Sequence, residues 1–184
     1  MKNTLITLLL IILLSGCVVT NRYNEYRGKV IDTETKVPIE GAAVLVVYKT
    51  EQYGLAGSVA HFEDAQEVLT DKNGEFIIRS KRIITFRVLS GWERYPQFNI
   101  FKPGYGCYPN HKDVKPMFVP NGTLPSNQYV TIELPNVRLE THESRLENYG
   151  CYPSELVPEF KYKKLFHLIQ QERLALGLDA RREP

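Results

Sequence analysis

The chain carries three cysteines and four histidines, residue types that form disulfides, bind metals or act in catalysis. Two of the cysteines stand in a repeated pentapeptide, in which Tyr105-Gly106-Cys107-Tyr108-Pro109 recurs as Tyr149-Gly150-Cys151-Tyr152-Pro153. Their wide separation lacks the C-x-x-C spacing of zinc ribbons and thioredoxin-like redox motifs. His111 and His142 lie near the two cysteines and could complete a four-ligand set if the fold brought them together. The pair therefore remains a candidate disulfide, metal site or redox dithiol.

No known catalytic motif is present elsewhere in the chain. The sequence contains no H-E-x-x-H, no G-x-S-x-G and no glycine-rich loop that would bind a phosphate. Two short stretches, His61-Phe62-Glu63-Asp64 and His142-Glu143, place titratable residues side by side. Direct neighbours in a strand point to opposite faces, so these stretches are typical of polar surface residues. We expect no catalytic residues and no cofactor.

Residues 1–16 have the pattern of a secretory signal peptide. Lys2 gives a short basic start, and Thr4 to Leu14 is an almost unbroken run of Leu and Ile. As a helix this run would span only about 16 Å, against about 30 Å of hydrocarbon in a bilayer. A run of this length is typical of the hydrophobic region of a signal peptide, not of a membrane-spanning helix.

Leu14-Ser15-Gly16-Cys17 resembles the lipobox of bacterial lipoproteins, in which small residues precede a lipidated cysteine. The resemblance implies cleavage before Cys17 and two or three acyl chains on that residue, which hold the protein at a lipid bilayer. Val18, where inner-membrane lipoproteins carry Asp, resembles the pattern sorted to the outer membrane of Gram-negative cells. Residues 17–25 are then a short membrane-proximal linker. Because this signal places the chain in an oxidising compartment, a Cys107–Cys151 disulfide becomes the default expectation.

The remaining sequence predicts an all-β domain, because short runs of β-branched and aromatic residues alternate with turn residues. Asp71-Lys72-Asn73-Gly74 is a tight-turn sequence, so residues 66 to 80 are interpreted as a hairpin. Alternation predicts inward-facing side chains at Val30, Val44, Val46, Phe76 and Ile78. The other predicted strands are Tyr26 to Asp32, Ala42 to Tyr48, Ile83 to Leu89, Gln97 to Lys102 and Tyr129 to Leu134.

An ordered set of motifs over residues 26–134 resembles the carboxypeptidase regulatory-like domain family. The motifs are Gly28-Lys29-Val30-Ile31-Asp32, Pro38-Ile39-Glu40-Gly41-Ala42-Ala43-Val44, Thr70-Asp71-Lys72-Asn73-Gly74-Glu75-Phe76 and Lys102-Pro103-Gly104-Tyr105. The resemblance implies a transthyretin-like Greek-key β-sandwich of about seven strands. It also implies a structural or binding module without catalytic residues. The chain departs from that family in an insertion at 103–127 and an extension at 135–184.

The extension contains a predicted amphipathic helix at about 158–176. Its apolar residues recur at helical spacing on one face, namely Tyr162, Leu165, Phe166, Ile169 and Leu176. Lys161, Lys163, Lys164 and Arg173 supply the solvated side. Such a helix packs on the sandwich or, alternatively, lies against the membrane or a partner.

The function expected from the sequence is a membrane-anchored, non-catalytic binding or structural module of the cell envelope. The net charge of +2 gives no reason to propose a nucleic-acid surface. Aromatic residues with polar tips are common on binding surfaces, so the candidate surface for an envelope protein or glycan is the set Tyr105, Tyr108, Tyr149 and Tyr152. The alternative is a small metal-dependent or hydrolytic envelope enzyme that uses His111 and His142.

Overall fold

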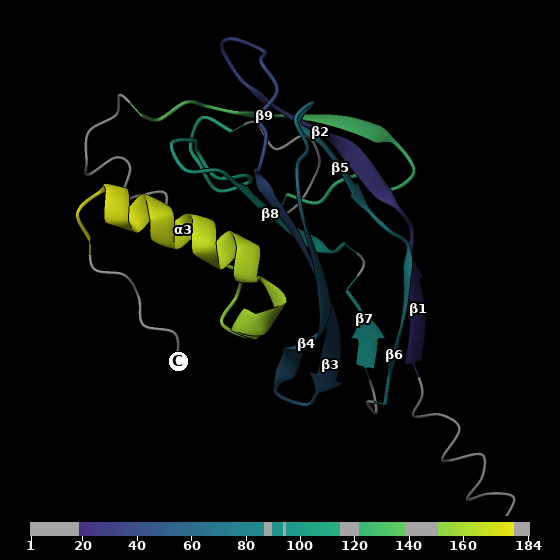
Figure 1. The fold of residues 1–184 in the computed structure, drawn as a ribbon. Helices are drawn as coiled ribbons and strands as arrows, with labels where there is room; N and C mark the ends of the chain where they lie inside the picture. Colours follow the sequence, from purple (N-terminus) through teal and green to yellow (C-terminus); the bar gives the residue numbers. More distant parts are fainter. Residues whose placement is uncertain (1–18, 87–89, 94, 115–121, 139–150, 179–184) are drawn as a thin grey trace, which may run out of the picture.

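A computed structural model describes residues 19–86, 90–93, 95–114, 122–138 and 151–178, and the described part is mostly β (Figure 1). The signal peptide 1–16 and Cys17 lie outside these residues. The elements are β1 (Val19–Tyr23), β2 (Tyr26–Asp32), β3 (Ala43–Gly54), β4 (Gly57–Leu69), β5 (Glu75–Ile78), β6 (Lys81–Thr85), β7 (Ser90–Trp92), β8 (Gln97–Phe101), β9 (Tyr129–Leu134), the 3₁₀ turn η2 (Glu159–Lys161) and the helix α3 (Lys163–Ala175).

The strands form several sheets. In one sheet β2 lies in the centre, antiparallel to β5 and parallel to β9. In another sheet β3 is central, with β4 on one side and both β8 and β7 on the other. Strands β1 and β6 form a two-stranded ribbon. The mostly β architecture predicted from the sequence is confirmed.

The first hydrophobic core lies between the β2 sheet and the β3 sheet. It contains every side chain that alternation predicted to point inward: Val30, Val44, Val46, Phe76 and Ile78. Phe98 and Ile100 of β8 join them, as do Val130, Ile132 and Leu134 of β9. A period of two along each strand was therefore enough to identify this core.

A second core lies on the opposite face of the β3 sheet, under helix α3. Ala43, Leu45 and Val47 point to this side, so β3 is buried on both faces from Ala43 to Tyr48. The helix contributes Leu165 and Ile169, which are 0% and 6% exposed. The interpretation of an amphipathic helix packed on the sandwich is confirmed, and Figure 1 shows α3 lying across this face. The helix is shorter than the predicted 158–176, because a 3₁₀ turn precedes it.

The hairpin predicted at 66–80 is wrong. The turn forms as expected, with Gly74 at φ +74° and its N–H donating to the Asp71 carbonyl oxygen at 2.8 Å. However, β5 pairs with β2 and not with β4, so the chain crosses from one sheet to the other. Turn chemistry fixes the local reversal, but it does not say whether the strands that follow remain hydrogen-bonded to each other.

The true hairpin is formed by β3 and β4 and is longer than the sequence indicated. Strand β3 continues past Tyr48 to Gly54, and β4 returns from Gly57, with a register shift between Tyr48 and Lys49. Most residues beyond Tyr48 are polar or small, so the sequence pattern did not predict this half of the strand. The predicted linker at 17–25 is also incorrect in part, because residues 19–23 form β1 and pair with β6.

Candidate functional site: a pocket beside the disulfide-bonded loop

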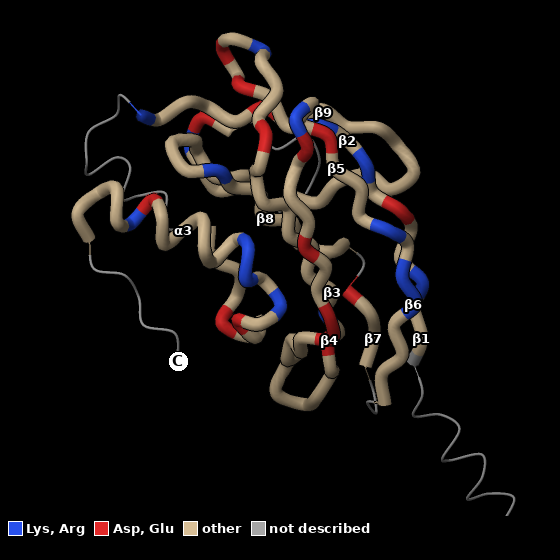
Figure 2. Tube along the Cα trace, in the orientation of Figure 1, with Lys and Arg blue, Asp and Glu red and all other residues tan. Residues whose placement is uncertain are grey.

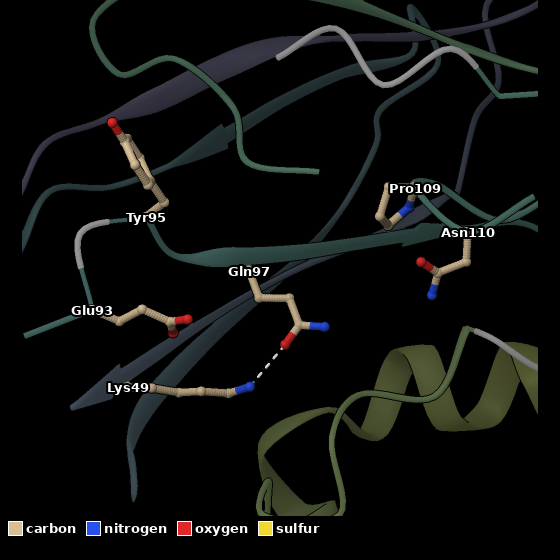
Figure 3. A pocket seen from close by; sticks show the side chains of 6 residues that line it. All are labelled: Lys49, Glu93, Tyr95, Gln97, Pro109 and Asn110. Carbon is tan, nitrogen blue, oxygen red and sulfur yellow. Dashed lines mark hydrogen bonds between the residues drawn. The ribbon is translucent and has the colours of Figure 1, made fainter. Parts of the chain in front are cut away.

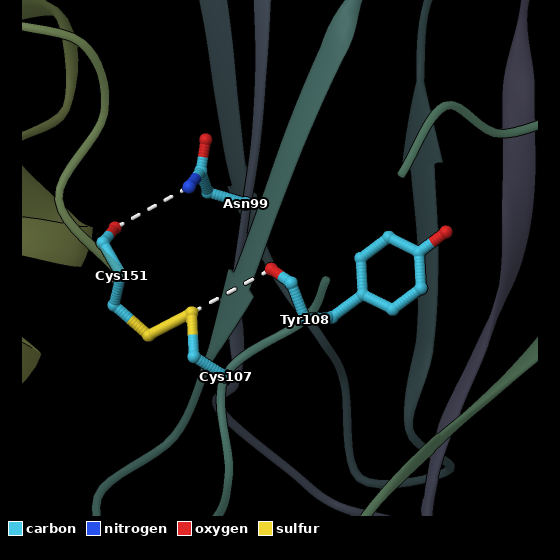
Figure 4. Close-up of a disulfide and its surroundings, with 4 residues drawn as sticks. All are labelled: Asn99, Cys107, Tyr108 and Cys151. Carbon is cyan, nitrogen blue, oxygen red and sulfur yellow. Dashed lines mark hydrogen bonds between the residues drawn. A yellow bond between two sulfur atoms is a disulfide. The ribbon is translucent and has the colours of Figure 1, made fainter. Parts of the chain in front are cut away.

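Cys107 and Cys151 form a disulfide, which confirms the expected pairing (Figure 4). Their Cα atoms lie 5.6 Å apart, in the usual range for this bond. Cys107 is held beside β8, because its neighbour Tyr108 exchanges two backbone hydrogen bonds with Ile100, at 3.0 and 3.1 Å. On the other side, the carbonyl oxygen of Cys151 accepts a hydrogen bond from the Asn99 amide at 3.5 Å. The bond therefore joins the edge of the β3 sheet to the segment that leads into α3.

The four tyrosines do not form one surface. Tyr108 is 1% exposed and lies in the first core, so it is excluded from any binding surface. Tyr105 is partly buried against that same core and carries the Arg138 guanidinium 5.7 Å from its ring centroid. Tyr152 packs on the second core, on the other face of the sheet. Tyr149 lies outside the described residues.

Tyr108 is buried away from Tyr152 because side chains alternate along the strand-like segment beside β8. Cys107 points into the second core and the adjacent Tyr108 points into the first, as Figure 4 shows. The described parts of the repeat, residues 105–109 and 151–153, therefore pack around the disulfide and have a structural role. The insertion predicted at 103–127 also contributes to the first core, through Val114 and Leu124.

A polar pocket of about 220 Å³ opens directly after this disulfide-bonded segment (Figure 3). Pro109 and Asn110 form one wall of the pocket, and Lys49, Glu93, Tyr95 and Gln97 form the rest. In Figure 3 the side chains of Lys49, Glu93, Gln97 and Asn110 are directed toward a common space. This pocket is the candidate functional site.

Three strands position the polar side chains of the pocket. Gln97 is the first residue of β8 and pairs with Val47, so it faces the same side of the sheet as the second core. Lys49 follows the irregularity in β3, and its ammonium donates a hydrogen bond to the Gln97 side chain at 2.9 Å. The backbone N–H of Glu93, just after β7, donates to the carbonyl oxygen of Lys49 at 3.0 Å. The pocket wall is thus built on regular backbone pairing.

Burial raises the pKa of the Glu93 carboxyl above its usual value, and the nearby Glu51 raises it further, whereas Lys49 opposes the shift. One carboxylate oxygen of Glu93 is buried and has no hydrogen-bond partner among the described residues. A carboxyl with an unused acceptor, an ammonium and two side-chain amides can together bind hydroxyl and amide groups of a ligand.

The histidines occupy separate places in the part of the chain that the structure describes. His61 in β4 contacts the Gln52 side chain at 3.1 Å. His111 is 7% exposed, and its Nδ1 accepts a hydrogen bond from the backbone N–H of Asp113 at 3.2 Å. His142 lies outside the described residues. Within the described ranges, no group of three or more His, Cys, Asp or Glu side chains could hold a metal ion.

Comparisons with known protein families, with curated proteins and with solved structures found no match for this chain. Among the helices of the described residues, none has the length and apolar character needed to cross a bilayer.

Sequence reasoning did not identify Lys49, Glu93, Tyr95 or Gln97 as site residues. They come from three strands, and only the pairing of β3 with β7 and β8 brings them together. Asn110 could have been predicted from the sequence, because it directly follows the first repeated pentapeptide. No pattern along the chain marked the others.

Proposed function

We propose that this protein is a lipid-anchored, non-catalytic binding module of the bacterial cell envelope. The lipobox-like Leu14-Ser15-Gly16-Cys17 after a short apolar run supports the anchor. Val18 supports sorting to the outer membrane. Acyl chains on Cys17 would be detected by mass spectrometry of the N-terminal peptide, and Cys17→Ser should release the protein from the membrane fraction.

The finer fold that we propose is the transthyretin-like Greek-key sandwich of carboxypeptidase regulatory-like domains. Two motif glycines have the roles that such a sandwich requires. A Cβ atom at Gly28 would lie 2.2 Å from the Val130 carbonyl oxygen, so β2 and β9 can approach each other only at glycine. Gly74 combines φ +74° with a hypothetical Cβ 2.4 Å from the Val30 carbonyl oxygen.

The observation that carries the binding proposal is the pocket whose one wall follows directly on Cys107. The disulfide and the backbone pairing with β8 hold Pro109 and Asn110 in place before any ligand arrives. Preorganisation of this kind reduces the entropy lost on binding.

The ligand that we propose for this pocket is a glycan of the cell envelope. Side-chain amides, an ammonium and a buried carboxyl offer donors and acceptors for sugar hydroxyls, and Tyr95, which is 43% exposed, offers a ring at the rim. Its chemistry is less suited to an apolar ligand, because the described lining contains only Pro109 without a polar side-chain atom.

The test is capture of solubilised envelope glycans by the tagged full-length chain, with mass spectrometry of the retained saccharides. Gln97→Ala with Asn110→Ala should abolish retention, whereas Lys72→Ala, on the exposed β4–β5 turn, should leave it unchanged. Equal retention by all three proteins, or by none, contradicts a glycan site in this pocket. If the chain instead captures a protein, and only the double variant fails to capture it, the ligand of this pocket is a protein and not a glycan.

The alternative enzyme that uses His111 and His142 finds no specific support in the described residues. The His111 ring is enclosed by its own loop, and its Nδ1 already accepts a backbone hydrogen bond. Stoichiometric metal in the purified protein that is lost in His111→Gln would revive this alternative.

A further inference from the structure

The tip of the β3–β4 hairpin is apolar and exposed. Leu55 lies between the two strands and is fully exposed, at 113% of its reference area. Tyr53 and Val59, on the flanking strand ends, are 57% and 60% exposed. The nine residues from Gln52 to Ala60 include no Lys, Arg, Asp or Glu. Tyr53 pairs with Ser58 and Val59 with Gln52, so the two side chains lie on opposite faces of the hairpin. Exposed apolar side chains thus surround the tip on both faces, and such a surface marks a site of interaction.

The other strand ends at this end of the molecule are uncharged as well. Gln52 pairs with Ser90, the first residue of β7. Thr85, the last residue of β6, pairs with Val19, the first residue of β1. Phe86 follows and is 74% exposed. Figures 1 and 2 show the hairpin tip and the start of β1 at one end, with no Lys, Arg, Asp or Glu marked on the tip.

This end of the domain is also where the chain arrives from the proposed anchor, so the inference rests on the proposed lipidation of Cys17. Val19 is two positions after Cys17, and this stretch can span at most about 7 Å. Acyl chains on Cys17 would therefore hold the start of β1 at the headgroups of the bilayer. The opposite end of β3 lies about 36 Å away along the strand, at about 3.3 Å per residue. The tether orients the domain with its hairpin tip toward the lipid.

We propose that the hairpin tip, Tyr53 to Val59, is a second membrane contact that inserts into the interfacial zone of the bilayer that holds Cys17. The tip combines an apolar Leu with a Tyr, whose amphipathic ring suits the headgroup level of a membrane. Because it lacks ionised side chains, no charge has to be desolvated on insertion. The backbone groups of the hairpin are paired with each other from Gly54↔Gly57 upward, so the tip enters with most of its hydrogen bonds made.

The second contact would fix the orientation of the domain on the bilayer. One lipid anchor lets a domain rotate about its attachment point, whereas a second contact fixes which face is presented to the envelope space. The pocket opens beside Lys49 and Gln97, near the middle of β3, and would then be held at a fixed distance from the bilayer.

The test uses the full-length lipidated protein in vesicles of phosphatidylethanolamine and phosphatidylglycerol. Leu55→Cys is labelled with an environment-sensitive fluorophore, and the vesicles carry a lipid whose acyl chain bears a quencher. The tip fluorophore should show blue-shifted emission and several-fold stronger quenching than the same label on Glu34→Cys. Glu34 is exposed in the loop after β2, at the opposite end of the strands, and provides the matched control.

A second labelled position, Phe86→Cys, separates insertion of the tip from mere proximity to the membrane. Its quenching should fall when Leu55→Asp is added, because the charged tip no longer enters the lipid. A lipidated protein that floats with the vesicles but whose tip label emits as in water overturns this inference alone. An N-terminal peptide without acyl chains overturns both the anchor and the inference.

Discussion

The two hydrophobic cores on either face of the β3 sheet are built in different ways. The first is formed mainly by strands that close on one another, and the five members predicted from the sequence follow from the alternation of side chains. The second is formed between the sheet and segments that arrive from the C-terminal part of the chain. It needs a disulfide, a buried ion pair and a carboxylate that caps a helix. The comparison indicates that strand patterning alone specifies the sandwich, whereas cross-links specify the position of the helix.

The ion pair joins η2 to two strands. Asp64 of β4 is 8% exposed and accepts hydrogen bonds from Lys161 of η2, at 2.8 Å, and from Lys81 of β6. Burial of the Asp64 carboxyl opposes its ionisation, but the hydrogen bonds from Lys161 and Lys81 outweigh it and lower its pKa. The expectation that Lys161 belongs to the solvated side of the helix is therefore wrong, because this ammonium is paired.

The first turn of α3, just after Lys161, is capped by a carboxylate of β4. Glu67 of β4 accepts hydrogen bonds from the backbone N–H groups of Lys164 and Leu165, at 2.9 and 2.6 Å. These N–H groups belong to the first turn of α3 and have no partner within the helix. A strand residue thus performs the role that Ser, Thr, Asn or Asp performs in most helices, and it fixes the helix to the sheet by the same contacts.

The largest effect is expected in the first core. Phe98→Ala should lower the free energy of unfolding by about 3–5 kcal/mol, because Phe98 is fully buried between the sheets. Denaturant unfolding would measure this loss, and hydrogen exchange should accelerate in β2, β9 and α3 together. Unchanged exchange in α3 would show that the two cores are independent of each other.

Removal of the disulfide should have a smaller and more local effect. Cys107→Ser with Cys151→Ser should cost about 2–4 kcal/mol, because the bond closes a long loop. Hydrogen exchange should increase in α3 while β2 and β9 keep their protection. Uniform loss of protection across all strands would contradict the inference that the disulfide stabilises the second core and not the first.

Asp64→Asn should cost about 1–3 kcal/mol at neutral pH, since both lysines remain without a charged partner. The folded-state pKa of Asp64 is lowered, so its contribution is present above the ordinary carboxyl pKa and is lost as the pH falls toward the folded value. The difference in melting temperature between wild type and variant should therefore shrink on acidification. A difference that stays constant down to acid pH would show that the ion pairs contribute nothing.

The smallest effect is expected for the cap. Glu67→Ala should cost about 0.5–2 kcal/mol, as for other helix caps. Glu67→Gln keeps an acceptor oxygen and should recover most of that loss. Thermal unfolding compares the two, and equal destabilisation by Ala and Gln would assign the effect to the charge of Glu67 and not to its hydrogen bonds.

The sequence predicted some parts of this molecule because the information is local. Strands β2 and β9 were predicted at their observed bounds, since alternation and flanking turns are readable in a few residues. The disulfide was predicted from the two cysteines that remain if the chain is exported and Cys17 is lipidated. The partner of β5, the length of β3 and the burial of Tyr108 depend on which strands pair, and pairing is set by the whole chain. The pocket was missed for the same reason.

The parallel pairing of β2 with β9 has a consequence for how the chain is made. Arg27 lies opposite Tyr129, so β2, which already has β5 on one side, gains its second neighbour only after Leu134 has been synthesised. In a chain that emerges N-terminus first, this edge of β2 therefore stays unpaired for most of the synthesis. Long-range closure of this kind also slows folding. Any factor that shields an unpaired strand edge during synthesis would act on this protein over that interval.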